Sequence, residues 1–196
     1  MNFYKFLEKP KIYNFIEKTL SLGNKSCLNC LGGLIKPKED DLLLDVGCGT
    51  GKYAKLFSKN YYGVDINKDY INYAKSNYNG NFDTMDATDL KFPDNTFDFI
   101  FNVSLFHHLS DENIKMAINE MKRVCKNNGK ILIIDAIFPS KKNFLGYLLF
   151  KLDRGKYTRK LKDLNNLLSK YNLELIQNNV KGSFPYRFAV FMYQKP

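Results

Sequence analysis

Long apolar runs are missing from this chain of 196 residues. The longest, residues 145–150, is far shorter than the roughly twenty residues that a membrane-spanning helix needs. The first ten residues also lack the apolar core followed by small side chains that marks a secretory signal. We therefore expect a soluble, cytoplasmic protein.

Cysteine and histidine, the usual ligands of structural zinc, are scarce. Four cysteines occur, and Cys27 and Cys30 have the C-x-x-C spacing of half a zinc site or of a redox pair. A zinc site needs a second pair of ligands, whereas the only histidines, His107 and His108, are adjacent to each other and far along the chain. We therefore predict reduced thiols and no bound metal. The remaining cysteines are expected to pack as small residues, Cys125 on a helix.

Acidic residues are outnumbered, with 20 Asp and Glu against 30 Lys and Arg and a formal net charge of +10. Such a charge favours anionic partners or surfaces. The general abundance of lysine and asparagine weakens it as evidence for any single basic site. The length fits one domain, and a hydrophobic fraction of 44% is that of a folded chain.

From residue 42 onward the pattern alternates between strand and helix, which predicts a parallel sheet covered on both faces. Strands are predicted at 42–46, 61–65, 82–85, 97–102 and 130–135, and helices at 52–59, 68–77 and 111–126. Asp111 is expected to cap the last helix, whose buried stripe is Ile114, Ala117, Ile118, Met121 and Val124. A helix at 159–170 and strands at 173–178 and 187–193 are expected to close the fold.

The part of the chain before residue 42 is less regular. Residues 3–22 have apolar side chains at helical spacing interrupted by Pro10, which predicts two short helices. The region 21–41 contains three glycines and Pro37, and it predicts a linker or an irregular segment.

Residues 42–51, Leu-Leu-Leu-Asp-Val-Gly-Cys-Gly-Thr-Gly, combine a short buried strand with a glycine-rich turn. Gly47, Gly49 and Gly51 permit positive φ and a close approach of the backbone to a ligand. The predicted helix that follows directs its unpaired N–H groups into the same space. A polar, partly anionic small molecule is the expected ligand.

Two interpretations of this turn compete. The dinucleotide fingerprint G-x-G-x-x-G would need its third glycine where Lys52 stands. The sequence Asp45-Val-Gly-Cys-Gly-Thr-Gly51 instead resembles the first motif of the class I S-adenosylmethionine-dependent methyltransferases. Further on, Asp65 ends the predicted second strand, residues 83–89 resemble the adenine-binding segment, and residues 92–102 resemble the turn and fourth strand of small-molecule members. The chain therefore resembles the small-molecule, methyltransferase-11-like branch of that family.

The resemblance implies an α/β fold: a Rossmann-like, doubly wound, mostly parallel seven-stranded sheet with an antiparallel last strand and helices on both faces. It implies S-adenosylmethionine as cofactor and S-adenosylhomocysteine as product. Asp65 would hold the ribose, Asp86 the adenine, Asn102 would lie near the methionyl end, and Asp45 would brace the loop or the cofactor's amino group. The expected cofactor contacts are Asp45, Gly47, Cys48, Gly49, Gly51, Asp65, Ile66, Asp86, Ala87, Asn102 and Val103.

His107 and His108 follow the predicted fourth strand, where open α/β sheets bind ligands. One of them could act as a general base, because imidazole titrates near neutral pH. A similar His-His-Leu recurs in methyltransferases with different substrates, so shaping the pocket is the simpler interpretation. Phe106, beside them, is a predicted substrate contact.

Residues 139–160 join an apolar run to a dense basic one. One interpretation is an amphipathic surface helix with a solvated charge cluster. Another is a substrate lid, in which apolar side chains cover a hydrophobic portion while Arg154, Lys156 and Arg159 meet an anionic group. Contact with a membrane surface would use the same features. Two residues of a later loop could also reach the substrate, Tyr186 and Arg187.

These features predict methyl transfer to a small-molecule or lipid-like acceptor, which an anionic group would suit. The family's Asn/Asp-Pro-Pro-Tyr/Phe/Trp signature for amino groups of bases or of glutamine is absent, because Asn102-Val-Ser-Leu stands in its place. Nucleic acid is therefore not expected as a substrate. The alternatives are an RNA methyltransferase, supported only by the basic charge, and a non-catalytic cofactor-binding sensor or partner protein. A nicotinamide-dependent oxidoreductase is weaker, because Lys52 breaks its fingerprint.

We expect a single domain, residues 1–196, that acts as a monomer or a homodimer. Its predicted parts are a helical cap and linker (1–40), a cofactor-binding core (41–136), a substrate lid region (137–170) and a closing β pair (171–196).

Overall fold

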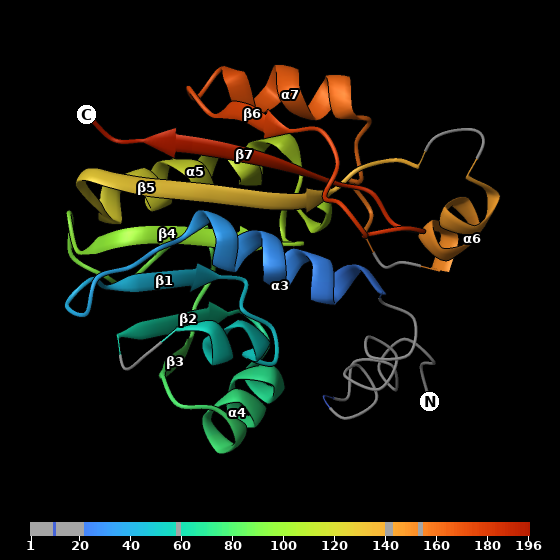
Figure 1. Cartoon of the computed structure of the whole chain (residues 1–196). Helices are drawn as coiled ribbons and strands as arrows, with labels where there is room; N and C mark the ends of the chain where they lie inside the picture. Colours follow the sequence, from blue (N-terminus) through green and yellow to red (C-terminus); the bar gives the residue numbers. More distant parts are fainter. Residues whose placement is uncertain (1–9, 11–21, 58–59, 140–142, 153–154) are drawn as a thin grey trace.

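A computed structural model describes residues 10, 22–57, 60–139, 143–152 and 155–196 (Figure 1). Its centre is a seven-stranded sheet in the order β3-β2-β1-β4-β5-β7-β6. Strands β3 to β5 in that order run parallel, and β7 pairs antiparallel with both β5 and β6. The predicted fold class is thus confirmed, including the antiparallel last strand. The strands are β1 (Leu43–Val46), β2 (Tyr61–Asp65), β3 (Asn81–Thr84), β4 (Phe97–Val103), β5 (Cys125–Ala136), β6 (Glu174–Gln177) and β7 (Phe188–Gln194).

Helices cover both faces of this sheet (Figure 1). Buried side chains of α3, α4 and the 3-10 helix η1 pack on one face, and those of α5 and α7 pack on the other. None of the described helices combines the length and apolar character needed to cross a membrane. The helices are α3 (Leu22–Leu34), η1 (Lys52–Leu56), α4 (Lys68–Asn77), the 3-10 helix η2 (Phe106–His108), α5 (Asp111–Val124), α6 (Phe144–Leu152) and α7 (Leu161–Ser169).

Strand β1 lies between β2 and β4, so the chain leaves it toward one edge of the sheet and later returns to its other side. In open α/β sheets this switch in strand order leaves a crevice beyond the carboxyl ends of the strands, where ligands bind. The glycine turn follows β1 and η2 follows β4, so the two segments that carry most of the predicted site meet at this crevice.

The prediction of a linker at 21–41 is wrong, because this region contains α3. Cys27 and Leu31 of α3 are fully buried against the sheet. Each glycine in a helix costs up to about 1 kcal/mol relative to alanine, and burial of this stripe outweighs that cost. The two helices predicted within 3–22 lie almost wholly outside the described residues.

Three local predictions near helix ends are also wrong. The segment 52–59 forms only the short η1, with Phe57 already extended. Ser110 rather than Asp111 caps α5, since its side chain accepts a hydrogen bond from the Asn113 amide at 3.2 Å. Cys125 lies at the start of β5, where it pairs with Phe97, and not on a helix. The predicted buried stripe of α5 is confirmed.

Candidate cofactor and catalytic site

The glycine turn after β1 has the backbone that its sequence predicts. Gly47, Gly49 and Gly51 have φ values of 76°, 55° and 81°, in the left-handed region that favours glycine. A Cβ at Gly51 would lie 2.8 Å from the Ala74 Cβ, whereas a Cβ at Gly49 would meet open space. The turn is therefore closely packed against α4 on one side and leaves room at Gly49 on the other.

Asp65 braces this turn from the end of β2. One of its carboxylate oxygens accepts from the Gly49 amide at 2.9 Å, and the other accepts from the Asn67 amide at 2.8 Å. Burial raises the pKa of Asp65, against the effect of these two hydrogen bonds. A carboxylate has about four acceptor positions, so both oxygens keep capacity for a further donor such as a ribose hydroxyl.

Asp45 is completely buried on the α3 side of the sheet. Its Oδ2 accepts a hydrogen bond of 2.6 Å from the Tyr61 hydroxyl, while its Oδ1 is buried without a partner. Burial raises the pKa of this carboxyl to about 7, and the hydrogen bond from Tyr61 and the charge of Lys52 oppose that rise. A buried acceptor without a partner beside an open turn is the arrangement expected where a ligand's cationic group completes the site.

Asn102 is a second buried polar residue without partners, since neither its amide nitrogen nor its amide oxygen is hydrogen-bonded. Its neighbours on β4 divide between the two cores: Ile100 belongs to the α5 side and Phe101 to the α3 side. Because side chains alternate along a strand, Asn102 points to the α5 side, opposite to Asp45. The two predicted cofactor residues thus lie on different faces of the sheet.

The segment after β3 forms a tight turn in which Asp86 bridges to Asp89. Asp86 Oδ1 accepts from the amide and from the hydroxyl of Thr88, both at 2.8 Å. Ala87 is half-buried next to it, and Val103 is buried at the end of β4. Ile66, directly after β2, is 71% exposed, which leaves its side chain available to a ligand at this edge.

The loop that continues from this turn, residues 85–96, contains no helix, and Arg123 of α5 holds it in place. The Arg123 guanidinium donates to the Leu90 carbonyl at 2.8 Å, to the Phe92 carbonyl at 2.9 Å and to Asp94 at 2.7 Å. Glu120 fixes the guanidinium in turn at 2.8 Å. One side chain of α5 thereby orders the loop that carries the predicted adenine-binding segment.

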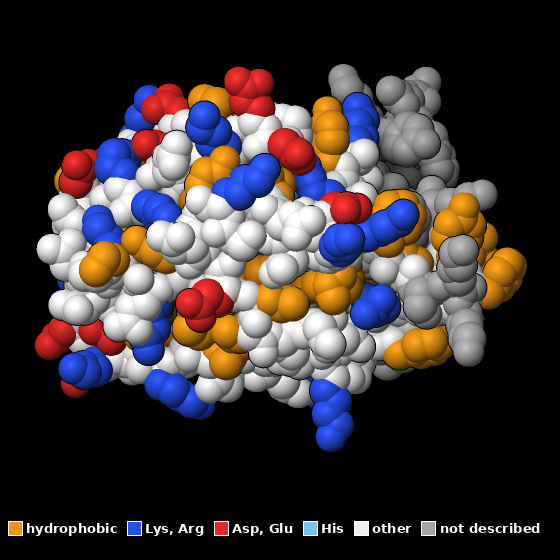
Figure 2. Space-filling view, turned by 90° about the horizontal axis from the view of Figure 1, so that it is seen from above, with side chains coloured by type: hydrophobic (Ala, Val, Ile, Leu, Met, Phe, Trp, Pro, Cys, Tyr) orange, Lys and Arg blue, Asp and Glu red, His pale blue; other side chains and the backbone are white. Residues whose placement is uncertain are grey.

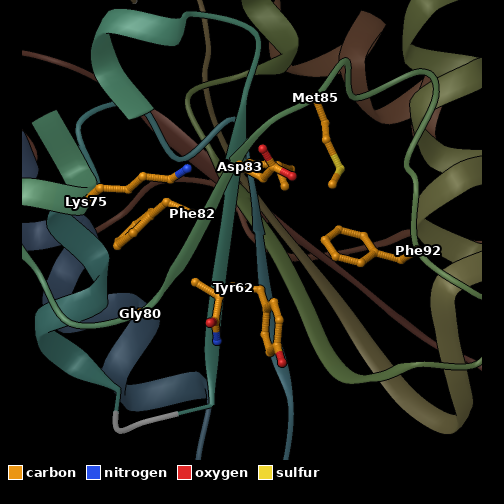
Figure 3. Close-up of a pocket in the computed structure, with 9 residues that line it drawn as sticks. Tyr62, Lys75, Gly80, Phe82, Asp83, Met85 and Phe92 are labelled. Carbon is orange, nitrogen blue, oxygen red and sulfur yellow. The ribbon is translucent and has the colours of Figure 1, made fainter. Parts of the chain in front are cut away.

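A hollow of about 360 Å³ opens between this loop and the β2–β3 edge of the sheet (Figure 3). Tyr62 and Phe92 form one wall, and Lys75 enters from α4 on the opposite side of β3 (Figure 3). The hollow shares Asp83 and Met85 with the predicted adenine-binding segment, but none of the turn glycines lines it. It therefore adjoins the candidate cofactor site without being that site.

His107 forms a buried pair with Asp135, a residue that the sequence interpretation did not select. His107 Nδ1 lies 2.7 Å from Asp135 Oδ1, and Asp135 Oδ2 accepts from the Phe106 amide at 2.5 Å. His107 and Asp135 are 5% and 1% exposed. His108 is exposed, and its ring centroid lies 4.1 Å from that of His107. The available sequence signal was an aspartate ending the apolar run 131–135 at the carboxyl edge of the sheet.

A family model described as a methyltransferase domain matches residues 44–133. Over these residues, and in its fold, the chain matches the class I S-adenosylmethionine-dependent methyltransferases. The matched stretch contains the glycine turn, the predicted adenine-binding segment and η2.

Curated relatives match between half and two thirds of the chain. An uncharacterized Bacillus subtilis methyltransferase, YcgJ, is 35% identical over 56% of this chain and 47% of its own length. A human protein named as a probable tRNA methyltransferase 9B is 33% identical over 65% of this chain and 29% of its own. A fatty-acid O-methyltransferase of Mycolicibacterium smegmatis is 34% identical over 50% of this chain and 38% of its own. The chain thus spans less than half the length of each of these relatives.

One solved structure matches this chain over its whole length. It comes from the complex between the Trm112 methyltransferase activator of Haloferax volcanii and a methyltransferase, with a TM-score of 0.76 and coverage of 100% and 99% of the two chains. The sequence identity is 12%, so this match shows a common fold.

Arg159, a predicted substrate contact, lies in the segment that follows α6, and all of its nitrogens donate to protein acceptors. They bond the carbonyls of Phe106, Tyr157 and Leu109 at 3.2, 2.8 and 2.9 Å, and the Asp111 carboxylate at 2.9 and 2.5 Å. The Tyr157 amide also donates to the His107 carbonyl at 2.9 Å. Arg159 therefore fastens this segment to η2.

The other predicted substrate residues are dispersed. Phe106 is fully buried in the core on the α5 side. Tyr186 is half-buried on the α3 side, with its ring centroid 6.2 Å from that of Phe188. Arg187 is half-buried and its carbonyl accepts from the Ile137 amide at 2.9 Å. Arg154 lies outside the described residues.

The first turns of α6 direct large apolar side chains outward. Gly146 faces the body of the protein, where a Cβ would lie 2.5 Å from the Pro185 carbonyl oxygen. The other large side chains of its first turns are exposed, with Phe144 at 78%. The parallel strands point their carboxyl ends toward this end of the molecule, and hydrophobic side chains are visible there in Figure 2. The exposed apolar residues of α6 are Phe144, Leu145, Tyr147 and Leu148, and those of nearby segments are Tyr157 and Phe184.

Proposed function

We propose that this chain transfers a methyl group from S-adenosylmethionine to a small-molecule or lipid-like acceptor. The observation that carries the acceptor class is the exposed apolar surface of α6, near the carboxyl ends of the parallel strands. Contiguous apolar surface on a folded protein is a common sign of a binding site. The bound cofactor supplies a methyl group already activated on a sulfonium, so alignment and exclusion of water can provide much of the acceleration.

The residues present fit this cofactor. The unpartnered Oδ1 of Asp45 offers an acceptor for its cationic amino group, and Gly49 leaves space at the turn. Asp65 and Asp86, at the ends of β2 and β3, are the proposed ribose and adenine contacts. Exposed Ile66 is proposed to pack against the base.

The surface around α6 fits an acceptor with an apolar part and an anionic part. Lys156 and Lys160 are exposed on the segment that follows α6, close in sequence to exposed Tyr157. The fatty-acid O-methyltransferase among the relatives supports a lipid-like acceptor of this kind. A membrane surface presenting such lipids is a proposed point of contact.

Two measurements test the proposal. S-adenosylhomocysteine binding by calorimetry should be strong in the unmodified chain and unchanged in Phe144→Ser/Leu148→Ser. Radioactive methyl transfer into pools of lipids and small apolar acceptors should fall at least tenfold in this double variant. The matched control is Met116→Ser, which alters a side chain of α5 that is 45% exposed. Equal transfer by the double variant and the control would contradict an acceptor role for α6.

The second candidate is an RNA methyltransferase that works with a small activator protein. The relative named as a probable tRNA methyltransferase, the complex with a Trm112 activator and the charge of +10 favour it. It predicts RNA binding whose affinity falls steeply with salt, because lysines would replace counterions on phosphates. The decisive outcome is methyl incorporation into tRNA only when a Trm112-type activator is present, with no incorporation into lipids. This outcome would replace the first candidate by the second.

The third candidate is a cofactor-binding sensor without methyl transfer. Strong S-adenosylhomocysteine binding without turnover in the lipid, small-molecule and RNA pools would support it.

A further inference from the structure

The pairing of His107 with Asp135 restricts the chemistry of the imidazole. A carboxylate can only accept hydrogen bonds, so the hydrogen of the 2.7 Å contact belongs to Nδ1 of His107. In a neutral ring the lone pair is then on Nε2. Because Asp135 also accepts from the Phe106 amide, its carboxylate is held by two donors and cannot rotate freely. Asp135 thus selects one tautomer and one orientation of the ring.

We propose that His107 accepts the proton of the methyl acceptor at Nε2 and that Asp135 is the positioning residue that prepares it. This inference rests on the proposed methyl transfer and narrows the acceptor to a nucleophile that carries a hydrogen, with an apolar alcohol as the first choice. A carboxylate needs no base. As the acceptor oxygen bonds the methyl carbon and the electron pair of the broken carbon–sulfur bond stays on sulfur, Nε2 takes the hydroxyl proton and Asp135 stabilises the imidazolium.

The segment after α6 encloses this pair. The Tyr157 amide donates to the His107 carbonyl, and Arg159 donates to the carbonyls of Phe106 and Leu109. A Cβ at Gly155 would lie only 2.3 Å from His107 Cδ2, so only a residue without a side chain fits there. The enclosure keeps the imidazole in a low-dielectric environment, where its hydrogen bond to Asp135 is stronger than in water.

The charged and titratable groups that the described residues bring to η2 act on the imidazolium in opposite directions. Asp135 favours it from β5, while Arg159 and the neighbouring His108 disfavour it. Asp111 lies against Arg159 and offsets part of its charge. Removal of the Asp135 charge should therefore disfavour the imidazolium form of His107.

The decisive variant is Asp135→Asn, which keeps the size of the side chain and an acceptor for the Phe106 amide. Its amide nitrogen would face Nδ1 and force the hydrogen onto Nε2, so the ring could no longer accept a proton there. Because the chain has two histidines, ¹⁵N NMR of the protein and of His107→Gln assigns the signals of both rings. The matched control is Asp98→Asn, on β4 but hydrogen-bonded to the Leu42 amide and to Lys126.

We expect Asp135→Asn to exchange the tautomer of His107 and to lower kcat for an apolar alcohol about 100-fold or more. The limb of the pH profile that follows His107 should disappear, while S-adenosylhomocysteine affinity and the control variant stay unchanged. An unaltered tautomer, or an unaltered pH profile with a changed tautomer, would overturn the inference. Failure of the unmodified chain to bind S-adenosylhomocysteine would instead overturn the proposed function, and preferred turnover of apolar carboxylates would remove the need for His107 as a base.

Discussion

Tyr61 donates a hydrogen bond of 2.6 Å to one oxygen of Asp45, and the other oxygen of this buried carboxylate has no partner. Tyr61 begins β2 and Asp45 lies within β1, so the pair ties two central strands together directly below the glycine turn. The carboxyl is therefore held by a phenol on one side and left available on the other.

The first prediction concerns pH. The Asp45 pKa is about 7 in the folded chain and about 4 when unfolded, so the folded state holds the proton more tightly. The stability that this contributes is present below pH 4 and is lost as pH rises toward 7. Without ligand, Asp45→Asn should flatten this part of the stability curve, as measured by urea unfolding at several pH values.

A cationic group of a ligand would instead favour the ionised form of Asp45, because it stabilises the carboxylate. S-adenosylmethionine affinity should therefore rise between pH 6 and 8, by up to about tenfold per pH unit below the pKa. Calorimetry in buffers with different ionisation enthalpies should detect proton release on binding near pH 7. Binding with no proton release would contradict contact between Asp45 and the cofactor's amino group.

The second prediction concerns Tyr61→Phe. The change leaves both oxygens of Asp45 without a donor, so the pKa of Asp45 should rise further and stability should fall by about 1–3 kcal/mol. Cofactor affinity at pH 7 should fall with it, because less of the carboxyl is ionised. Tyr62→Phe is the matched control, since the Tyr62 ring packs on Phe92 and Phe97 on the other side of the sheet. Equal effects of the two variants would contradict a special role of the Tyr61 hydroxyl.

The third prediction separates folding from binding at the glycine turn. Gly51→Ala would place a Cβ 2.8 Å from the Ala74 Cβ and should destabilise the fold, which thermal unfolding can measure. Gly49→Ala meets no protein atom and should cost only about 1–2 kcal/mol for its positive φ. If a ligand occupies the open space at Gly49, its affinity should nevertheless fall more than tenfold. An unchanged affinity in Gly49→Ala would place the ligand elsewhere.

The fourth prediction decides between two roles of Arg159. Arg159→Lys keeps the positive charge but loses the planar set of donors that bonds three carbonyls and Asp111. If Arg159 fastens the segment after α6, hydrogen exchange at the Tyr157 amide should accelerate while the amides of β5 stay protected. A raised KM with unchanged exchange would instead indicate that Arg159 contacts the substrate directly.

Periodic patterns in the sequence were sufficient for the sheet, for α4 and for the buried stripe of α5, because each buries one regular face. The helix α3 was missed since its glycines are local signals, whereas its burial against the sheet depends on residues distant in the chain. Asp135 was missed for the same reason. Its partners, His107 and the Phe106 amide, become neighbours only when β4 and β5 pair.

Because Arg123 holds only one end of the candidate site, the two ends should differ in the free energy that their opening costs. The loop 85–96 is held by the Arg123 guanidinium of α5. It should therefore open only when α5 itself moves or unfolds. His107 is covered instead by the short surface segment that follows α6. Local opening of this segment should cost much less free energy. A bound nucleoside would then stay in place while the segment that follows α6 opens several times. Acceptor exchange and cofactor release should therefore have separate rate constants.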